Sequence, residues 1–315
     1  MDFAAIEAAA RVDGSAGWNL CIEKTAQEVL RLRLPEQGRA EVFATPEPVV
    51  AGAFSPSGVS VVEKEDGFVF DGVIPFASGS DRASWFMAGG MHTIDGVPVL
   101  LAGLVPREQV KVLDTWHVSG LRGTASCDVE VRDVFVPAHR CLTLVGPTGA
   151  EDPYPGLPLM SRLGCGLAWA GLGIAAHAFE LLKQMVTTRR RFGDVAMLAD
   201  QFDVQAAVGE AAGLLASGRA LLHTTWTEVV EQLPLLEPRD LADLRLAYVT
   251  ATRHALAVAD LAYEMAGSAA LYEKHGLEGC WRDLHALAHH MAVSPRHLPA
   301  IGRVHLGLPA GTPFI

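Results

Sequence analysis

Few cysteines and the lack of any long apolar run set the first limits on this sequence. Only five of its 315 residues are cysteine, and these are widely spread and include no C-x-x-C pair. That usage is typical of reduced thiols in a cytoplasm and excludes a disulfide framework or a zinc knuckle. The longest uncharged run, 163–176, is shorter than the ~20 residues that a bilayer span needs and is rich in glycine and alanine. We therefore expect a buried helix there.

Positive charge is also scarce. Lys and Arg number 25 against 36 Asp and Glu, which gives a formal net charge of -11. Such a balance repels phosphate backbones and anionic lipid, so it argues against nucleic-acid and membrane partners. The first 15 residues lack the basic segment of a secretory signal, and the sequence also lacks a strand-GxGxxG-helix unit for a nicotinamide cofactor. With 50% hydrophobic residues, the chain is expected to be globular, with a sizeable core.

The apolar pattern changes its period twice, and this predicts three parts. Residues 1–40 show helical spacing interrupted near 14–17, which predicts two helices with a tight joint. Residues 41–150 follow a period of two with turn signals at 55–58, Asp66-Gly67 and Asp95-Gly96, which predicts an antiparallel β-sandwich or barrel. In residues 151–315 the helical spacing returns, and segments at 157–191, 200–232, 238–272 and 279–293 predict an antiparallel four-helix bundle.

Several segments resemble one enzyme superfamily. GLRGTASCDVEVRDVFVP (120–137) and TTRRRFGDVAMLADQFDVQ (187–205) resemble elements of the acyl-CoA dehydrogenase superfamily. ARVDGSAGW (10–18), IPFASGSDRASW (74–85) and WRDLHALAHHMAVSPRHLPAIG (281–302) resemble its flavin-dependent monooxygenase branch, the oxygenase components of two-component aromatic hydroxylases. The resemblance spans nearly the whole chain. It implies an α+β, acyl-CoA dehydrogenase-like fold with N-terminal helices, a central antiparallel β-domain and a C-terminal four-helix bundle. It also implies that residues 1–40 are the remnant of a larger N-terminal helical domain.

The sequence departs from the dehydrogenases of this superfamily where they carry a catalytic carboxylate. The late stretch reads HALAHHMAV, and the early one reads LMSRLGCG, with Ser161 at about the position of the acid. Without that base, dehydrogenation of an acyl thioester loses a rate factor of roughly 10²–10⁴. The resemblance therefore favours a monooxygenase that takes reduced FMN or FAD from a separate flavin reductase and uses O2 to hydroxylate an aromatic or heteroatom-containing small molecule. The alternatives are an FAD-dependent acyl-CoA dehydrogenase-type enzyme and a catalytically silent protein of this fold.

The resemblance places one group of flavin contacts at the end of a β-domain strand. Ser78 would meet the reactive edge of the flavin and Phe76 would line the pocket, while Gly79 and Ser80 complete the turn. Turn chemistry alone is the structural alternative for these small polar residues.

A second pair flanks the GLRGT turn. Trp116 would lie against the flavin ring, and Ser126, ten residues later, would reach the flavin or its phosphate. A tryptophan packed on a hairpin is the alternative for Trp116.

The resemblance assigns a third group to the boundary between two bundle helices. Arg189 would clamp a flavin phosphate across a subunit boundary through its bidentate fork, with Phe192 beside it and Gln201 as a weaker companion. Arg190 and Arg191 fit a solvated helix end. The alanine-rich and glycine-rich helix faces predict oligomerisation, with a homotetramer preferred.

Histidine is concentrated at the C-terminal end, where five of the twelve lie in the last 31 residues: His285, His289, His290, His297 and His305. By position in the resembling family His290 would face the flavin, with His285 as second choice. An ordinary histidine pKa of ~6.5 suits proton transfer near neutral pH. A metal site is disfavoured because no HExxH motif is present and Asp283 is the one acidic residue nearby.

Overall fold

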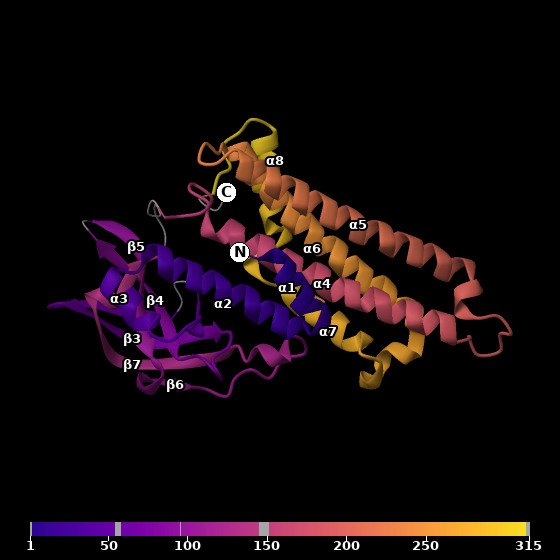
Figure 1. Cartoon of the computed structure of the whole chain (residues 1–315), viewed down its shortest axis with the longest axis horizontal. Coiled ribbons are helices and arrows are strands. Elements are labelled where there is room, and N and C mark those ends of the chain that lie inside the picture. The colour runs from indigo at the N-terminus through magenta and orange to yellow at the C-terminus, as the bar shows by residue number, and fades with distance from the viewer. Residues whose placement is uncertain (1, 54–57, 95, 145–150, 313–315) are drawn as a thin grey trace. The chain divides into compact units, whose positions relative to one another are not determined.

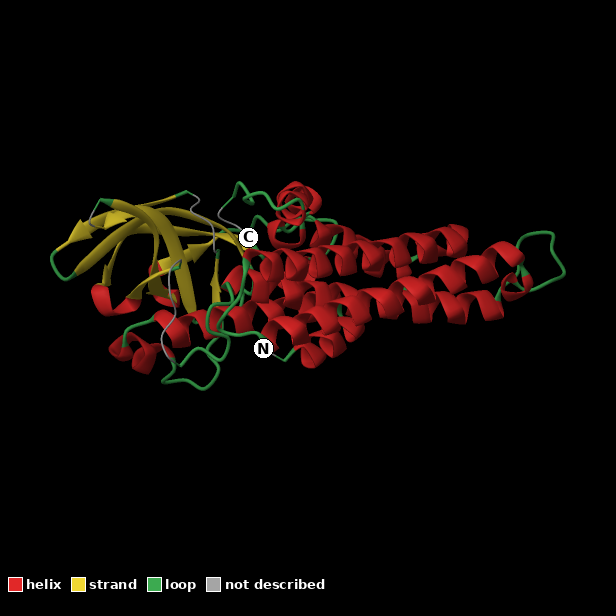
Figure 2. Cartoon of the chain, turned by 90° about the horizontal axis from the view of Figure 1, so that it is seen from above, coloured by secondary structure: helices red, strands yellow, loops and turns green. Residues whose placement is uncertain are grey.

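The structure, a computed structural model, describes residues 2–53, 58–94, 96–144 and 151–312, and these belong to two units. The helical unit comprises Met1–Cys21, Ser119–Leu121 and Gly156–Ile315, and the β unit comprises Ile22–Val118 and Arg122–Pro155. Figure 2 shows the strands in yellow and the helices in red. The boundaries at residues 40 and 150 rest on composition and stay a prediction. The predicted turn residues Ser55 to Ser57 and Asp95 lie outside the described residues.

The first two helices meet at an aspartate, not at the predicted stretch 14–17. They are α1 (Phe3–Val12) and α2 (Gly14–Arg33). Asp13 leaves the helical conformation, and its Oδ1 accepts a hydrogen bond from the backbone N–H of Ala16 at 2.7 Å, so it caps α2. Gly17 then lies inside α2, where a Cβ would come within 2.3 Å of the Cβ of Ala10. The glycine therefore serves close helix packing instead of the joint.

The predicted bundle is present in the helical unit. Its helices are α4 (Leu159–Thr188), α5 (Phe202–Glu231), α6 (Pro238–Ala266) and α7 (Leu277–Ala288), followed by α8 (Leu298–His305). Figure 1 shows α4, α5 and α6 running side by side, and α7 packs against α4 and α6. Two helices end earlier than predicted. Gly267, with φ at +57°, stops α6, and His290 takes the extended conformation of a cap after α7.

The helix α4 contains the long uncharged run. By length and composition it could cross a membrane, and 78% of its most apolar stretch is buried. Its glycines permit this burial, because a Cβ at Gly164 would lie 2.8 Å from the ring of Tyr248. The expectation of a buried helix is confirmed.

The β unit contains the end of α2, the helix α3 (Glu36–Val42) and two four-stranded sheets. The strands are β1 (Val50–Gly52), β2 (Val59–Lys64), β3 (Gly67–Ala77), β4 (Trp85–Ile94), β5 (Val97–Pro106), β6 (Val110–Val112), β7 (Cys127–Pro137) and β8 (Cys141–Thr143). The orders are β1-β4-β5-β8 and β2-β3-β7-β6. The pairing is antiparallel as predicted, except that β1 pairs in parallel with β4, which it reaches without a hairpin.

Core packing joins the two sheets face to face. Phe70 of β3 is fully buried, and its ring lies where a side chain at Gly103 of β5 would be, since a Cβ there would come within 2.5 Å of the ring. Val129 and Val131 of β7 belong to the same apolar core. The prediction of a β-sandwich is confirmed.

All five cysteines are free, and four of them are buried. Burial raises the pKa of Cys141 and of Cys280 to about 12, and it also raises the pKa of Cys165. These thiols are therefore structural apolar groups.

Two adjacent residues of α7 hold the short segment Ser119–Leu121. The backbone N–H of Leu121 donates to Oδ1 of Asp283 at 2.6 Å, and the guanidinium of Arg282 donates to the carbonyl of Ser119. Gly120 lies so close that a Cβ would come within 2.0 Å of the Arg282 carbonyl oxygen. We call this contact the α7 clamp.

We predict that Gly120→Ala destabilises the protein by about 1–3 kcal/mol, because backbone atoms must move to admit the methyl group. Gly279→Ala is the matched control, since Gly279 lies in α7 and no described neighbour comes within 4 Å of the place where its methyl group would lie. It should stabilise the helix by about 0.5–1 kcal/mol. Urea unfolding measures both changes, and equal stability of Gly120→Ala and the wild type would show that the α7 clamp is loose.

Candidate active site

Three hydroxyl groups meet inside the β unit, although two of them are far from the third in sequence. Ser78 follows β3, and Thr124 and Ser126 precede β7. The Oγ atoms of Ser78 and Ser126 are 2.8 Å apart, and Oγ1 of Thr124 is 2.7 Å from Oγ of Ser126. All three side chains are buried. We call this group the hydroxyl cluster; it joins two of the predicted residues, Ser78 and Ser126.

Backbone strain shapes the turn that carries Ser78. Phe76 has φ at +54°, an unusual value for a residue with a bulky side chain, and Gly79 has φ at +77°. The N–H of Gly79 donates to the carbonyl of Thr124 at 2.8 Å, so the two loops are joined through backbone as well as side chains. The hydroxyl of Ser80 is fully buried and donates to the carbonyl of Ala125 at 2.7 Å. Ser80 therefore holds the loop through its side chain.

An aromatic pair lies on the same turn. Phe76 is 67% exposed, and its ring meets that of Trp116 edge to face, with 6.2 Å between the ring centroids. An exposed phenylalanine in a strained backbone conformation is costly, because it gains neither burial nor a relaxed φ. Such a residue is typical of a site that receives a ligand.

The predicted histidine His290 is in the helical unit, directly after α7. Its Nδ1 accepts a hydrogen bond from the backbone N–H of Ala292 at 3.2 Å, and its ring meets that of Trp18 edge to face at 5.4 Å. Burial lowers the pKa of His290 to about 4. This pKa lies below the range that the expected proton exchange near neutral pH requires, and the flavin-facing position of His290 stays a prediction. The neutral ring carries its proton on Nε2 and can donate a hydrogen bond there.

His285, the second choice, has different neighbours. Its Nε2 lies 3.0 Å from Oδ1 of Asp260, and its ring packs against that of Trp281 with 4.1 Å between centroids. Nε1 of Trp281 donates to the same Asp260 oxygen at 2.8 Å. His285 and His290 therefore belong to separate side-chain clusters.

Arg189 lies at the end of α4 and contacts a histidine. Its Nη2 is 2.8 Å from Nε2 of His275, whose pKa is lowered by burial and by the charge of Arg189. Phe192 is fully exposed, and the side chain of Gln201 donates to Asp194 at 3.3 Å. Arg189 and Gln201 thus have different partners among the described residues, and the joint flavin role of these three side chains stays a prediction.

Sequence reasoning missed three contributors. Thr124 completes the hydroxyl cluster, Trp18 packs on His290, and Asp283 closes the α7 clamp. Thr124 and Trp18 stand within segments that carry the family resemblance, which is the signal that could have found them. Asp283 also stands within such a segment, 281–302, but its contact could not be predicted because its partner is a backbone N–H. Among the described residues no three His, Cys, Asp or Glu side chains gather as a metal site would require.

Comparison with known proteins gives consistent relatives. Residues 165–295 match the family described as acyl-CoA dehydrogenase, C-terminal domain. The flavin-dependent monooxygenase, oxygenase subunit HsaA, of Mycobacterium tuberculosis (strain ATCC 25618 / H37Rv) is 30% identical over 336 residues, which cover 99% of this chain and 83% of the relative. The FADH(2)-dependent resorcinol hydroxylase, oxygenase component, of Rhizobium sp. (strain MTP-10005) is 29% identical, over 89% of this chain and 74% of its own length. The crystal structure of 3-HSA hydroxylase from Rhodococcus sp. RHA1 has a TM-score of 0.88 at 25% identity and covers 99% of this chain and 84% of that one.

The low pKa of His290 predicts a pH-dependent loss of stability. Between about pH 6.5 and pH 4 the unfolded chain binds a proton at this residue that the folded chain does not, so stability falls as the pH falls. At pH 5 this effect is about 2 kcal/mol. His290→Asn removes it, while Oδ1 of the asparagine can still accept from Ala292.

Urea unfolding near neutral pH and at pH 5 tests this prediction. The wild type should lose about 2 kcal/mol more than His290→Asn on acidification. The exposed neighbour provides the control, since His289→Asn should behave as the wild type does. Equal losses in all three proteins would mean that His290 is accessible to protons.

Proposed function

The chain belongs to the flavin-dependent monooxygenases of the acyl-CoA dehydrogenase superfamily, and we propose that it is the oxygenase partner of a separate flavin reductase. As a monooxygenase it is an oxidoreductase that uses reduced flavin and O2 to hydroxylate a small aromatic or heteroatom-containing molecule. The names of its relatives call them oxygenase subunit or oxygenase component, which supports a reductase partner here. FADH2 is the first flavin to test, since the name of the Rhizobium relative specifies it; FMN is the second.

The assignment of the site rests on the hydroxyl cluster and its two aromatic neighbours, the exposed Phe76 and the half-buried Trp116. A flavin presents a planar aromatic ring and a polar edge of nitrogen and oxygen atoms, so it needs apolar ring contacts and small hydrogen-bonding groups together. Phe76 and Trp116 supply the first, and Ser78 supplies the second through a hydroxyl oriented by Ser126. These residues fit a flavin. When bound, reduced flavin supplies the electrons that activate O2.

The lack of a carboxylate at both positions of the dehydrogenase base also argues against the dehydrogenase alternative. Ser161, near the position of the early catalytic acid, is buried in α4 and carries no carboxylate. At the late position the chain has the turn Met291–Val293, preceded by His290. A proton α to a thioester needs a base, and neither segment supplies a carboxylate.

His290 supports the oxygenase in a way that differs from the sequence-based expectation. A histidine that remains neutral at pH 7 is a poor proton acceptor but a good fixed donor through Nε2. Two contacts hold the orientation of its ring. Nδ1 accepts a hydrogen bond from the N–H of Ala292, and the ring of Trp18 packs against it. We assign it the role of hydrogen-bond donor to the substrate or to activated oxygen, in surroundings that exclude water.

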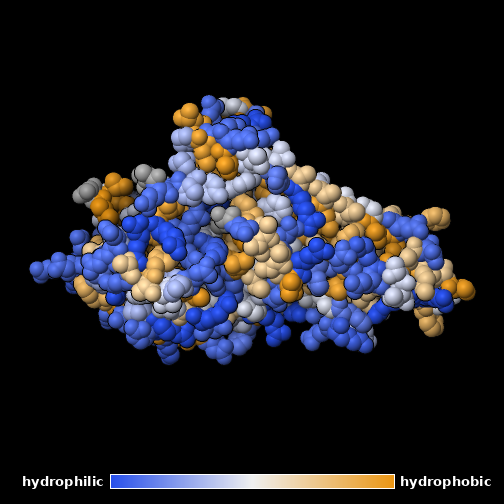
Figure 3. Space-filling model, viewed as in Figure 1, coloured by the Kyte–Doolittle hydropathy of each residue, from blue (hydrophilic) through white to orange (hydrophobic). Residues whose placement is uncertain are grey.

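The helical unit supports assembly as a homotetramer. The outward face of α5 carries small residues, among them Gly209 and Gly213. The exposed Phe202 lies at the start of this helix. Figure 3 shows weakly and strongly hydrophobic residues along the outer edge of the molecule where α5 lies. Exposed apolar surface of this kind favours a subunit contact. A neighbouring chain would also give Arg189 and Phe192 the partner that their predicted flavin role requires. We place the protein in the cytoplasm, where its free thiols would stay reduced.

We predict that the protein binds reduced flavin at least about 10-fold more tightly than oxidised flavin, because a hydroxyl oxygen can accept from the additional N–H of the reduced ring. Ser126→Ala removes the hydroxyl that joins Ser78 to Thr124 and should weaken binding of reduced flavin by roughly 5–10-fold. Anaerobic titration with FADH2 and FMNH2 measures this. The control is Ser60→Ala, which removes an exposed hydroxyl of β2. If neither redox form bound, the silent-protein alternative would hold.

Light scattering tests the assembly. We predict a particle of four chain masses, which becomes smaller on Gly213→Glu because a carboxylate would be buried at the α5 contact. Ala40→Glu, at an exposed position of α3, adds the same charge elsewhere and should leave the mass unchanged. A monomeric wild type with full affinity for reduced flavin would contradict both the assembly and the role of Arg189 across subunits.

A further inference from the structure

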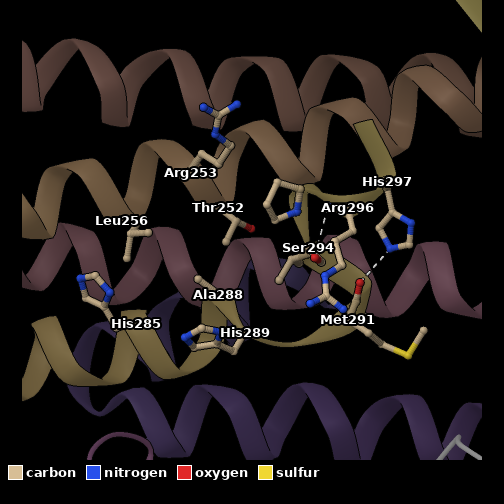
Figure 4. A pocket seen from close by; sticks show the side chains of 12 residues that line it. Thr252, Arg253, Leu256, His285, Ala288, His289, Met291, Ser294, Arg296 and His297 are labelled. Carbon is tan, nitrogen blue, oxygen red and sulfur yellow. Dashed lines mark hydrogen bonds between the residues drawn. The ribbon is translucent and has the colours of Figure 1, made fainter. Parts of the chain in front are cut away.

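A separate pocket lies entirely within the helical unit, between α6, α7 and the turn that follows α7 (Figure 4). Its volume is about 700 Å³, within the range of small-molecule sites. Its walls are formed by Thr252, Arg253, Leu256, His285, Ala288, His289, Met291, Val293, Ser294, Pro295, Arg296 and His297. His290 is not one of them. Its chain neighbours His289 and Met291 are, so the pocket borders the turn that carries His290 without including that side chain.

The ionisable side chains that line this pocket are all basic. It contains two arginines and three histidines, and no Asp or Glu, in a chain whose formal net charge is -11. Within the described part of the chain neither Arg253 nor Arg296 forms an ion pair, and His285 alone among the lining residues has a carboxylate partner, Asp260. Figure 4 shows Arg296 and His289 projecting into the pocket, whereas the guanidinium of Arg253 points away from the histidines. Arg296 and His289 are thus available to an incoming anion.

A buried arginine behind the pocket adds a second observation. Arg245 of α6 is 4% exposed, and within the described ranges its Nε has no hydrogen-bond partner. Its Nη1 lies 3.4 Å from Nδ1 of His297, whose Nε2 lies 2.8 Å from the carbonyl of Met291. No carboxylate among the described residues pairs with Arg245. A buried cation without a counter-charge is unfavourable, and an anion in the adjoining pocket would offset part of that cost.

The remaining walls define the rest of the ligand. Leu256, Ala288 and Val293 present apolar surface. Ser294 accepts a hydrogen bond from the N–H of Arg296 at 3.3 Å, which leaves its own O–H to donate. An inorganic anion would leave the apolar surface exposed, and a neutral ligand would leave the cations unpaired. The lining fits a molecule with one anionic group and an apolar body.

We propose that this pocket binds a small organic anion, a carboxylate or a phosphate monoester with an apolar body. Its anionic group pairs with Arg296 and His289, and its body lies against Leu256 and Ala288. The positive field of Arg245 contributes through His297. The proposal rests on the lining of the pocket and does not depend on the proposed function.

Titration calorimetry with three probes tests the proposal on the intact protein. Benzoate and phenyl phosphate carry the two anionic groups on the same ring, and benzyl alcohol is the neutral counterpart. We expect at least one anion to bind at least about 10-fold more tightly than benzyl alcohol, and high salt to weaken that binding. The anion that binds more tightly shows whether the natural ligand is a carboxylate or a phosphate monoester.

Substitution locates the site. Arg296→Gln should reduce affinity for the anion by about 10-fold or more, because it removes a charged hydrogen bond. Arg239→Gln is the matched control, since Arg239 is an exposed arginine of α6 paired with Asp243 outside the pocket. It should leave anion affinity unchanged, and both variants should bind reduced flavin as the wild type does.

Three results would overturn the proposal. These are failure of both anions to bind, equal binding of the neutral probe, and anion binding that Arg296→Gln does not weaken. A change in particle mass with Arg296→Gln, without anion binding, would show that an acidic segment of a second chain occupies the pocket instead. None of these results would affect the monooxygenase assignment, which reduced-flavin binding tests separately.

Discussion

The hydrogen bond from the backbone of Leu121 to Asp283 holds the short segment Ser119–Leu121 on α7 within the helical unit. Ser126 of the hydroxyl cluster follows Leu121 by five positions, and His290 follows Asp283 by seven. Burial raises the pKa of Asp283, while the Leu121 N–H stabilises its charged form. Gly120 is required at this point because no side chain fits beside Arg282. One carboxylate on α7 thus holds this short segment in place.

The helix α7 also separates two environments for histidine. His285, inside the helix, pairs with the exposed Asp260, whereas His290, after its end, is enclosed beside Trp18 and stays neutral. Five positions along the chain are enough for this difference, because the cap turns the backbone away from the helical path. Position relative to the helix end therefore decides whether a histidine contacts an exposed carboxylate or is enclosed beside an aromatic ring.

Periodicity predicted the four bundle helices, the two N-terminal helices and the sandwich, because each buries a regular apolar face. It misplaced the joint between the first two helices. Asp13 caps α2 there, whereas the small residues 14–17, which were expected to interrupt the helix, lie inside it. The family resemblance supplied Ser78 and Ser126, which the structure brings together. It could not supply the pKa of His290, which depends on burial by residues far away in sequence, nor the contact of Asp283 with a backbone N–H.

The buried cysteines have a chemical consequence for an enzyme of this kind. Reaction of reduced flavin with O2 generates oxidants next to the protein that performs it, and thiols are attacked mainly as thiolates. The raised pKa values of Cys141, Cys165 and Cys280 keep these groups protonated at physiological pH, and their burial limits contact with diffusing oxidants. The packing of the core thereby protects these three thiols from oxidants that the reaction releases.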